Sequence, residues 1–282
     1  MPNDSDDVNI FTIPDSASTS AGAMFFAQHF DDLTWAASLS MLAKEIQELA
    51  DMIIEAVGKS RESAVWGSEV FRSSGLADTD EAIAWAKRHF KSKSEYAQRL
   101  VKLNAQTSAE AVLCRYVDNY TCYLSDLLRL LFDRYPKTLT DAVATISVKD
   151  VFGYSSFDAL LASMAERTIN DLSFRGFGEI ESYYTKRFGF SLIADVSWRQ
   201  SVTFAIATRN LLVHRRGVID SRFTAMTNSG SNRIGHRINV GDRVWQEFLP
   251  AILRSVHDID KRAAIKFGFQ AAFVLPAGKS LS

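Results

Sequence analysis

The chain has 282 residues, 47% of them hydrophobic, with 32 Lys or Arg against 33 Asp or Glu. This composition is ordinary for a folded protein and excludes a chain that is disordered throughout. No run approaches the roughly 20 apolar residues that cross a membrane. The acidic start MPNDSDDVNI also lacks the basic and apolar parts of a secretion signal. We therefore expect a cytoplasmic protein with no membrane partner.

Charge is distributed unevenly along the chain. Residues 1–82 contain 4 basic and 15 acidic side chains, whereas residues 199–282 contain 13 basic and 5 acidic ones. A basic end rich in arginine suits a surface that binds a polyanion. An ordinary solvated face would produce the same pattern, so charge alone leaves both interpretations open.

The first 106 residues divide into a tail and a helical extension. Residues 1–22 are rich in Asp, Ser and Thr and are predicted to be a disordered tail. Residues 23–106 are predicted to be helical, with short helices at 79–90 and 93–104. The first and longest helix ends at Gly58 and has an apolar seam spaced three and four residues apart. The seam consists of Trp35, Leu39, Leu42, Ile46, Leu49 and Ile53.

A helical domain is predicted over 107–268. Its first helix begins at a capping box at Thr107 and ends before Pro136. Further helices are predicted over 156–171 and 178–188. The buried stripe of the first helix is predicted to be Leu113, Val117, Tyr120, Leu124, Leu127 and Leu131.

The next helix is marked at both ends. Asp195 is predicted to cap its start, it runs to about His214, and Gly217 lies just past its end. Val202, Ile206 and Val213 are predicted to face inward. Residues 217–241 are polar and rich in glycine, and we expect a long loop or a small hairpin there.

The last helix is predicted to start at Asp242 and end at Gly268, with residues 269–282 as a C-terminal tail. Pro250 lies inside its apolar stripe and should kink it. Nowhere does the sequence alternate like a strand over more than a few residues. The predicted fold class is therefore mainly α, a helical bundle preceded by a helical extension.

One short segment carries a chemical pattern. Arg209, Asn210 and His214 lie on the last turns of a predicted helix. With 20 Arg, 5 His and 9 Asn in the chain, Arg-Asn-x-x-x-His is expected by chance only about 0.01 times. Arginine offers a fork of donors to phosphate oxygens, and histidine exchanges protons near neutral pH. Five residues correspond to about 140° of helical rotation, so Arg209 and His214 share no face unless the helix loosens.

This segment, followed by Gly217 and the run Val218-Ile219-Asp220, resembles the active-site motif of HEPN domains. The helical segments around 108–134, 166–172 and 179–189 are similar in order and character to one branch of that family. The helix that ends in Lys266-Phe267-Gly268 also fits. The resemblance is loose over 107–268 and absent over 1–106.

The resemblance implies an all-α, metal-independent endoribonuclease that needs no cofactor and acts in a toxin–antitoxin or phage-defence system. His214 is then the general base or acid, Arg209 neutralises charge on phosphorus, and Asn210 orients His214 or a phosphate. Arg215 and Arg216, directly after the histidine, are expected to bind RNA. The implied partners are the RNA substrate, a second copy in a two-fold homodimer and an antitoxin or defence-system protein.

Two other functions remain open at this stage. A HEPN-like bundle without catalysis would serve as a sensor or adaptor that binds a protein partner or nucleic acid. A metal phosphohydrolase would instead use the pair His257-Asp258, for which the sequence offers no convincing set of further ligands. In the plainest structural interpretation, Asn210 and His214 hold a helix end and Arg209 is a surface residue.

Overall fold

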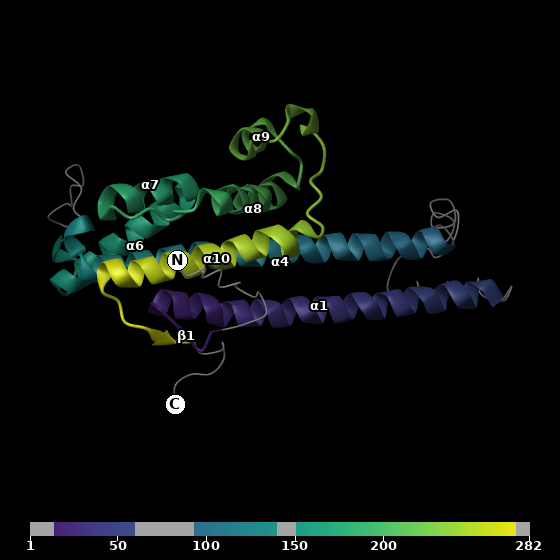
Figure 1. Ribbon diagram of the computed structural model, residues 1–282, viewed down its shortest axis with the longest axis horizontal. Helices are drawn as coiled ribbons and strands as arrows, with labels where there is room; N and C mark the ends of the chain where they lie inside the picture. Colours follow the sequence, from purple (N-terminus) through teal and green to yellow (C-terminus); the bar gives the residue numbers. More distant parts are fainter. Residues whose placement is uncertain (1–13, 60–92, 140–150, 275–282) are drawn as a thin grey trace, which may run out of the picture. The chain divides into compact units, whose positions relative to one another are not determined.

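The computed structural model describes residues 14–59, 93–139 and 151–274 (Figure 1). These residues are mainly helical, as predicted. The helices are α1 (Ser20–Lys59), α4 (Lys93–Arg134), α6 (Phe157–Arg175), α7 (Phe177–Phe188), α8 (Val196–Arg215), α9 (Ser221–Thr227) and α10 (Leu249–Phe267). Shorter elements are the 3-10 turns η1 (Pro136–Leu139) and η2 (Ser231–Arg233), the π-helical turn η3 (Val244–Phe248), and the strands β1 (Ser16–Ala17) and β2 (Ala272–Phe273). No helix of the described ranges is long and apolar enough to cross a membrane.

The chain forms two compact units, and their boundaries differ from the predicted ones. One unit comprises Met1–Leu33 with Glu110–Ser282, and the other comprises Thr34–Ala109. α4 is continuous through the boundary predicted between 106 and 107. Thr107 lies inside this helix, where its hydroxyl donates to the carbonyl of Leu103 (2.9 Å) and does not cap a helix start. A threonine whose hydroxyl donates to a carbonyl of the preceding turn is compatible with a helix interior. The predicted capping box at Thr107 is therefore wrong.

The unit Thr34–Ala109 contains the later part of α1 and the first part of α4. The predicted long helix is confirmed and extends one residue past Gly58, to Lys59. Of the predicted seam, Trp35 is half-buried, and the side chains from Leu39 onward lie outside the described residues. The helix predicted at 79–90 also lies outside them.

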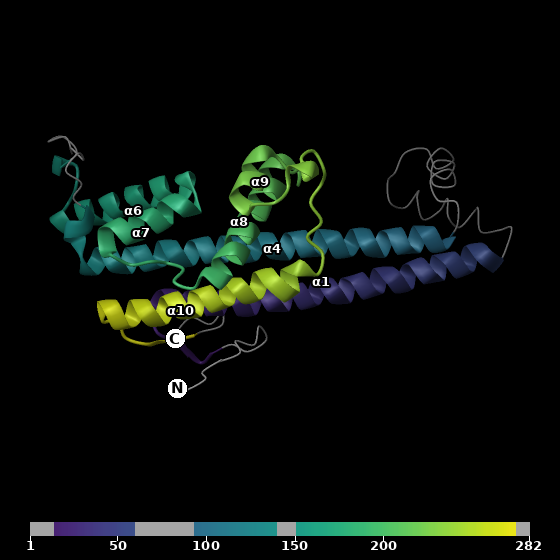
Figure 2. The ribbon, with the colours of Figure 1, turned by 45° about the horizontal axis from the view of Figure 1, so that its top comes forward.

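α4 is the centre of the larger unit. All six predicted stripe residues are at most 2% exposed, which confirms the inward face of the helix. The Tyr184 hydroxyl of α7 donates to the carbonyl of Leu124 (2.6 Å), and the hydroxyls of Tyr120 and Ser255 of α10 are hydrogen-bonded (3.1 Å). Figure 2 shows α6, α7 and α10 along the same stretch of α4. Burial of this stripe is therefore what holds the bundle together.

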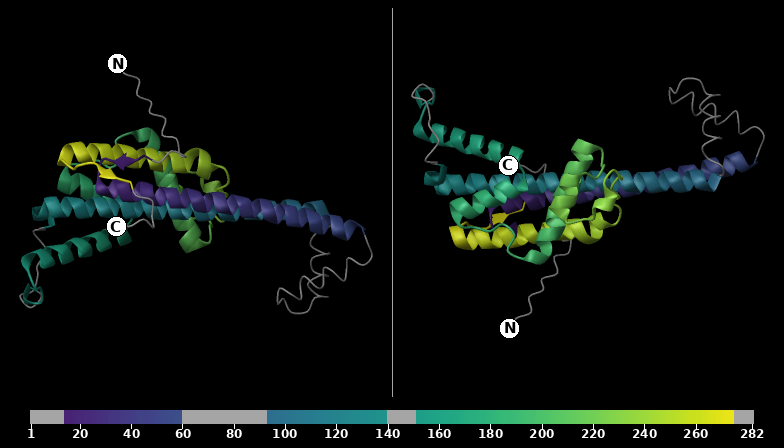
Figure 3. Two further views of the ribbon diagram at one scale, coloured as in Figure 1. Left: turned by 90° about the horizontal axis from the view of Figure 1, so that it is seen from below. Right: turned by 90° about the horizontal axis from the view of Figure 1, so that it is seen from above.

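A side chain of α10 caps the start of α1. The buried Asp260 carboxylate accepts from the backbone N–H groups of Ser18 (2.7 Å) and Thr19 (3.1 Å) and from the Thr19 hydroxyl. Thr19 in turn accepts from the N–H of Gly22 (3.0 Å). Figure 3 shows this start of α1 and β1 beside α10.

The two predicted tails are therefore wrong where they are described. Residues 14–22 include β1 and the start of α1, and β2 lies in the segment predicted as the C-terminal tail. The two strands pair antiparallel, with Ser16 opposite Phe273. Residues 1–13 and 275–282 lie outside the described ranges. The composition of residues 1–22 predicted disorder. This prediction failed because the carboxylate that caps the start of α1 comes from a residue more than 240 positions away.

Candidate functional site

The segment with the Arg-Asn-x-x-x-His pattern lies on α8, whose two ends are formed as predicted. The Asp195 carboxylate accepts from the N–H of Ser197 (2.8 Å). Hydrogen bonding to the side chain and then to the backbone of Ser197 lowers the pKa of Asp195. At the other end, the N–H of Gly217 donates to the carbonyl of Leu211 (2.9 Å). Val202 and Ile206 are buried, but Val213 is 52% exposed because the last turn of α8 extends beyond the core.

Arg209 turns toward α4. Its Nη2 lies 2.7 Å from Oδ1 of Asp118, and its Nη1 donates to Oδ1 of Asn210 (3.3 Å). The Arg209 side chain is 26% exposed, and its buried Nε has no hydrogen-bond partner. Asp118 was missed in the sequence because it lies 91 positions earlier, on a different helix. The guanidinium is thus held by a carboxylate but keeps unused donor capacity.

His214 lies on the exposed last turn of α8. In the part of the chain that the structure describes, its ring has no hydrogen bond or ion pair. α8 is a regular helix through Arg215, so Arg209 and His214 remain separated by about 140° of helical rotation. Within one chain, their side chains therefore do not lie on one face of the helix. Asn210 is exposed, four residues before His214, and its amide oxygen accepts from Arg209.

The expected RNA-binding residues surround the end of α8. Arg215 is 62% exposed, and its Nε is 3.5 Å from Oδ2 of Asp220. Arg216 is exposed and adopts a left-handed conformation (φ 54°), which is uncommon for a residue other than glycine. Exposed Arg222 and Arg233 follow on α9 and η2. None of Arg216, Arg222 and Arg233 has a carboxylate partner among the described residues.

Residues 217–241 form a small folded lobe, which corresponds in part to the predicted hairpin. The N–H of Ile219 donates to the carbonyl of His236 (3.0 Å), and the N–H of Ile238 donates to that of Gly217 (2.8 Å). α9, which the sequence did not predict, is capped by Asp220 through the N–H of Phe223 (2.8 Å).

This backbone pairing brings a second histidine into the same lobe. His236 is exposed and pairs through its carbonyl with the strand-like segment directly after α8. Its neighbour Arg237 donates to the carbonyl of Arg216 (2.9 Å) and pairs with Glu110 (2.9 Å). No spacing rule connects residues 214 and 236, so the sequence pattern does not single out His236.

α8 is held in place by the π-helical turn η3. Arg243 stacks its guanidinium over Phe204 of α8 (4.2 Å) and Phe248 of η3 (4.8 Å), and it pairs with Glu247 (2.9 Å). The irregularity predicted at Pro250 occurs one turn earlier, in the π-helical turn η3. Pro250 itself lies in the first turn of α10, where its missing N–H interrupts no hydrogen bond within α10. The predicted Asp242 cap is wrong, since Arg243 precedes η3 without a side-chain cap.

The alternative pair His257-Asp258 lies on α10. Asp258 is engaged by Arg262 (2.7 Å), and His257 is exposed. Within the ranges described, no three His, Cys, Asp or Glu side chains are grouped so that they could hold a metal ion. The pair therefore gains no further ligands there.

Comparison with protein-family models, curated proteins and solved structures returned no match to this chain. The resemblance to HEPN domains therefore rests on the residues of α8 and on the order of the helices, and it stays a prediction.

Proposed function

We propose that the protein is a metal-independent endoribonuclease of the HEPN kind, the effector of a toxin–antitoxin or phage-defence system. The observation that carries this proposal is the end of α8, where His214 is exposed and directly followed by Arg215 and Arg216. A proton-exchanging ring among cations is suited to a phosphodiester, whose charge grows during cleavage.

The chemistry follows from these side chains. His214 takes the proton of a ribose 2′-hydroxyl, and the 2′-oxygen forms a bond to the adjacent phosphorus. The bond from phosphorus to the 5′-oxygen breaks, and that oxygen leaves with a proton from a second imidazolium. Arg209 and the cations after His214 neutralise the charge on the phosphoryl oxygens. The products are a 2′,3′-cyclic phosphate and a 5′-hydroxyl.

The second imidazolium is best supplied by a second copy of the chain. One histidine cannot accept and donate a proton in the same displacement, and the HEPN resemblance implies homodimers whose motifs face each other. An α8 end that is exposed in the single chain is available for such pairing. The two-fold dimer also offers a way around the 140° that separates Arg209 from His214 on one helix.

Incubation of total RNA with the purified protein in EDTA tests the proposal. The wild type should cut and leave cyclic phosphate ends, and a deoxyribose at the cut site should prevent cleavage there. His214→Ala should lower the rate by about 10²–10⁴. His257→Ala, which removes another exposed histidine, should cut at the wild-type rate. A 3′-hydroxyl product, or loss of cutting in EDTA, would contradict the mechanism.

A second candidate is a non-catalytic adaptor. The ion pair between Arg209 and Asp118 favours it, because a guanidinium neutralised by a carboxylate is less available to phosphate. If the protein is an adaptor, it should leave RNA intact under all conditions. Its His214→Ala variant should then bind RNA or a protein partner as tightly as the wild type does.

A further inference from the structure

A hollow of about 410 Å³ lies between the first turns of α1 and the middle of α4, within the larger unit. Its volume is in the range of roughly 300–1,000 Å³ that is usual for small-molecule sites. Three carboxylates line it, those of Asp32, Asp118 and Asp126. Its apolar lining comes from Met24, Phe25 and Cys122. A ligand for this hollow needs positive charge and apolar surface together.

The two carboxylates on α4 are well separated. Asp118 and Asp126 are eight residues apart, which is about 12 Å along a helix and about 80° around it. Cys122 lies midway between them, so the lining is polar at two places and apolar between. No group of His, Cys, Asp and Glu in the described ranges converges on a metal ion. Separated carboxylates favour an extended cation over a compact one.

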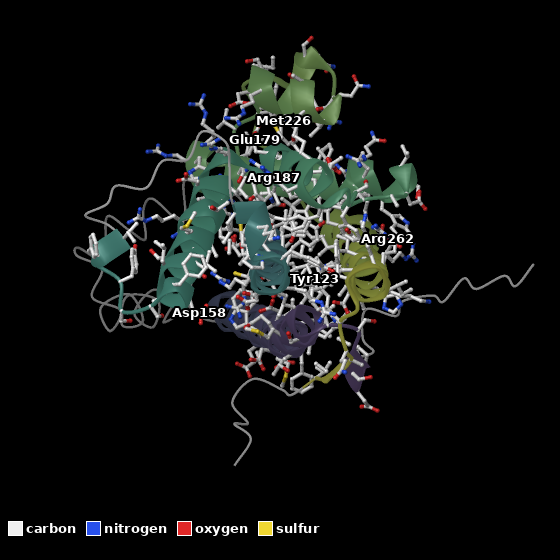
Figure 4. All side chains as sticks on the ribbon, turned by 90° about the vertical axis from the view of Figure 1, so that its left-hand side faces the viewer. Tyr123, Asp158, Glu179, Arg187, Met226 and Arg262 are labelled. Atoms are coloured by element: carbon white, nitrogen blue, oxygen red, sulfur yellow. The ribbon has the colours of Figure 1, made fainter. Side chains whose placement is uncertain are left out.

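Two buried polar atoms of the lining residues lack a partner. Oδ1 of Asp32 accepts from Arg115 (2.9 Å) and Gln28 (3.0 Å), but its buried Oδ2 has no hydrogen bond. The hydroxyl of Tyr123, which is labelled in Figure 4, is also buried without a partner. Leaving such atoms unsatisfied is unfavourable. The Asp32 oxygen in particular has unused capacity for a donor.

The carboxylates near the hollow are not fully neutralised by the protein. Arg115 pairs with Asp32 and Arg209 pairs with Asp118. Arg129, in contrast, is shared by Asp126 and Glu166, each 2.6 Å away. Burial raises the pKa of Asp126 in spite of this arginine. Four carboxylates and three guanidinium groups leave one excess negative charge.

We infer that this hollow is a binding site for a linear aliphatic polyamine. One ammonium group meets Asp118, another meets Asp126, and the methylene chain between them covers Met24, Phe25 and Cys122. An ammonium also competes with Arg209 for Asp118. If the proposed ribonuclease function holds, ligand binding therefore loosens the restraint on Arg209.

Calorimetric titration of the full chain with spermidine, without RNA, tests the site independently of any nuclease activity. The wild type should bind with saturation, and Asp118→Asn combined with Asp126→Asn should weaken binding at least tenfold. Glu179→Gln, an exposed carboxylate at the start of α7 (Figure 4), should change nothing. Ethylenediamine and Mg²⁺, which are too compact to span the carboxylates, should bind at least tenfold more weakly than spermidine. Absence of saturable spermidine binding, or equal binding by the double variant and Glu179→Gln, overturns the proposal.

Cys122 provides a second measurement that needs no substitution. Its exposed thiol lines the hollow, whereas the half-buried Cys114 does not. Bound spermidine should slow the reaction of Cys122 with a neutral maleimide and leave the reaction of Cys114 unchanged. A cation that merely gathers near the carboxylates would favour the thiolate and accelerate the reaction. Acceleration, or no change at Cys122, therefore counts against an occupied site.

Discussion

At the scale of single residues, the contact between Arg209 and Asp118 determines how available the guanidinium is. Asp118 is 55% exposed, so a phosphate that approaches Arg209 also meets this carboxylate. Carboxylate and phosphate compete for the same donors, and they repel each other. The contact thus acts as a restraint on RNA binding under the proposed function.

Asp118→Asn should strengthen the binding of a short RNA about fivefold. Two unit charges 4 Å apart in water interact by roughly 1 kcal/mol, and removing one repulsive charge recovers energy of that order. Fluorescence anisotropy at fixed salt measures the change. Asp133→Asn, an exposed carboxylate further along α4, controls for net charge. Equal effects of the two substitutions would mean that Asp118 does not restrain Arg209 specifically.

The two exposed histidines of the α8 end can be separated by experiment. If the second proton carrier comes from a partner copy, His236→Asn should cut RNA at nearly the wild-type rate while His214→Ala loses activity. His236 lies in the lobe that pairs with the segment after α8, so it is the internal competitor for this role. Rates measured across pH 5–8 decide between them. A His236→Asn enzyme as slow as His214→Ala, with an altered pH profile, would assign the second proton to His236.

At the scale of elements, Asp260 joins α10 to the start of α1. Asp260→Ala leaves the N–H groups of Ser18 and Thr19 without their acceptor, which costs about 1–3 kcal/mol for the buried donor of Thr19 and less for the half-buried donor of Ser18. Asp260→Asn should be far milder, because its oxygen can accept both N–H groups while its amide donates to the Thr19 hydroxyl. Urea unfolding measures both changes. Similar losses for Ala and Asn would show that charge, and not hydrogen bonding, holds this junction.

The same pair of variants has a pH signature. Burial raises the pKa of Asp260 above its value in the unfolded chain. The folded state therefore binds the proton more tightly, and the free energy of unfolding contributed by Asp260 falls as pH rises through that raised pKa. Asp260→Asn does not titrate, so the difference in stability between wild type and Asp260→Asn should change with pH above about 4. A constant difference from pH 4 to 7 would exclude this contribution.

The left-handed turn after α8 combines a structural cost with a proposed function. Arg216 has a φ of 54°, a conformation that costs roughly 1–2 kcal/mol for a residue other than glycine. Arg216→Gly should therefore raise the midpoint of thermal unfolding while it weakens RNA binding. Arg222→Gly, in the first turn of α9, is the matched loss of an exposed arginine and should lower that midpoint. A less stable Arg216→Gly protein would show that the arginine side chain itself supports the turn.

The sequence predicts elements well where the signal is local. Asp195, Gly217 and Gly268 mark helix ends through hydrogen bonds to residues a few positions away, and these ends are confirmed. The prediction of the N-terminal segment failed because the hydrogen-bond partner that orders it is distant in the sequence. Asp260 caps α1 across more than 240 residues.

The candidate site shows the same division between local and distant signals. The Arg-Asn-x-x-x-His pattern at a helix end singles out Arg209 and His214 as candidates, and helix geometry predicts that they do not share a face. Neither reveals Asp118, which approaches from α4, or His236, which the lobe brings to the end of α8. Their contributions arise from tertiary packing, which has no period in the sequence.

At the scale of the whole molecule, the proposed chemistry requires more than one chain. In the single chain, Arg209 is directed toward α4 and His214 is exposed at the end of α8. In the proposed dimer, a two-fold axis near this end would bring the motifs of both copies, and so both His214 rings, to one site. The dimer is thus a catalytic requirement of the proposal, and it can be tested by activity.

An excess of inactive His214→Ala, mixed with the wild type and allowed to exchange subunits, should lower the total rate of RNA cleavage severalfold. A mixed dimer keeps only one His214 ring, so it cannot supply both the general base and the general acid. The control uses the same excess of His257→Ala, which keeps His214 and should not lower the rate. Light scattering on the same samples reports the mass. A stable monomer that cuts RNA at the wild-type rate, or a cleavage rate that excess His214→Ala does not lower, rules out a site shared between copies.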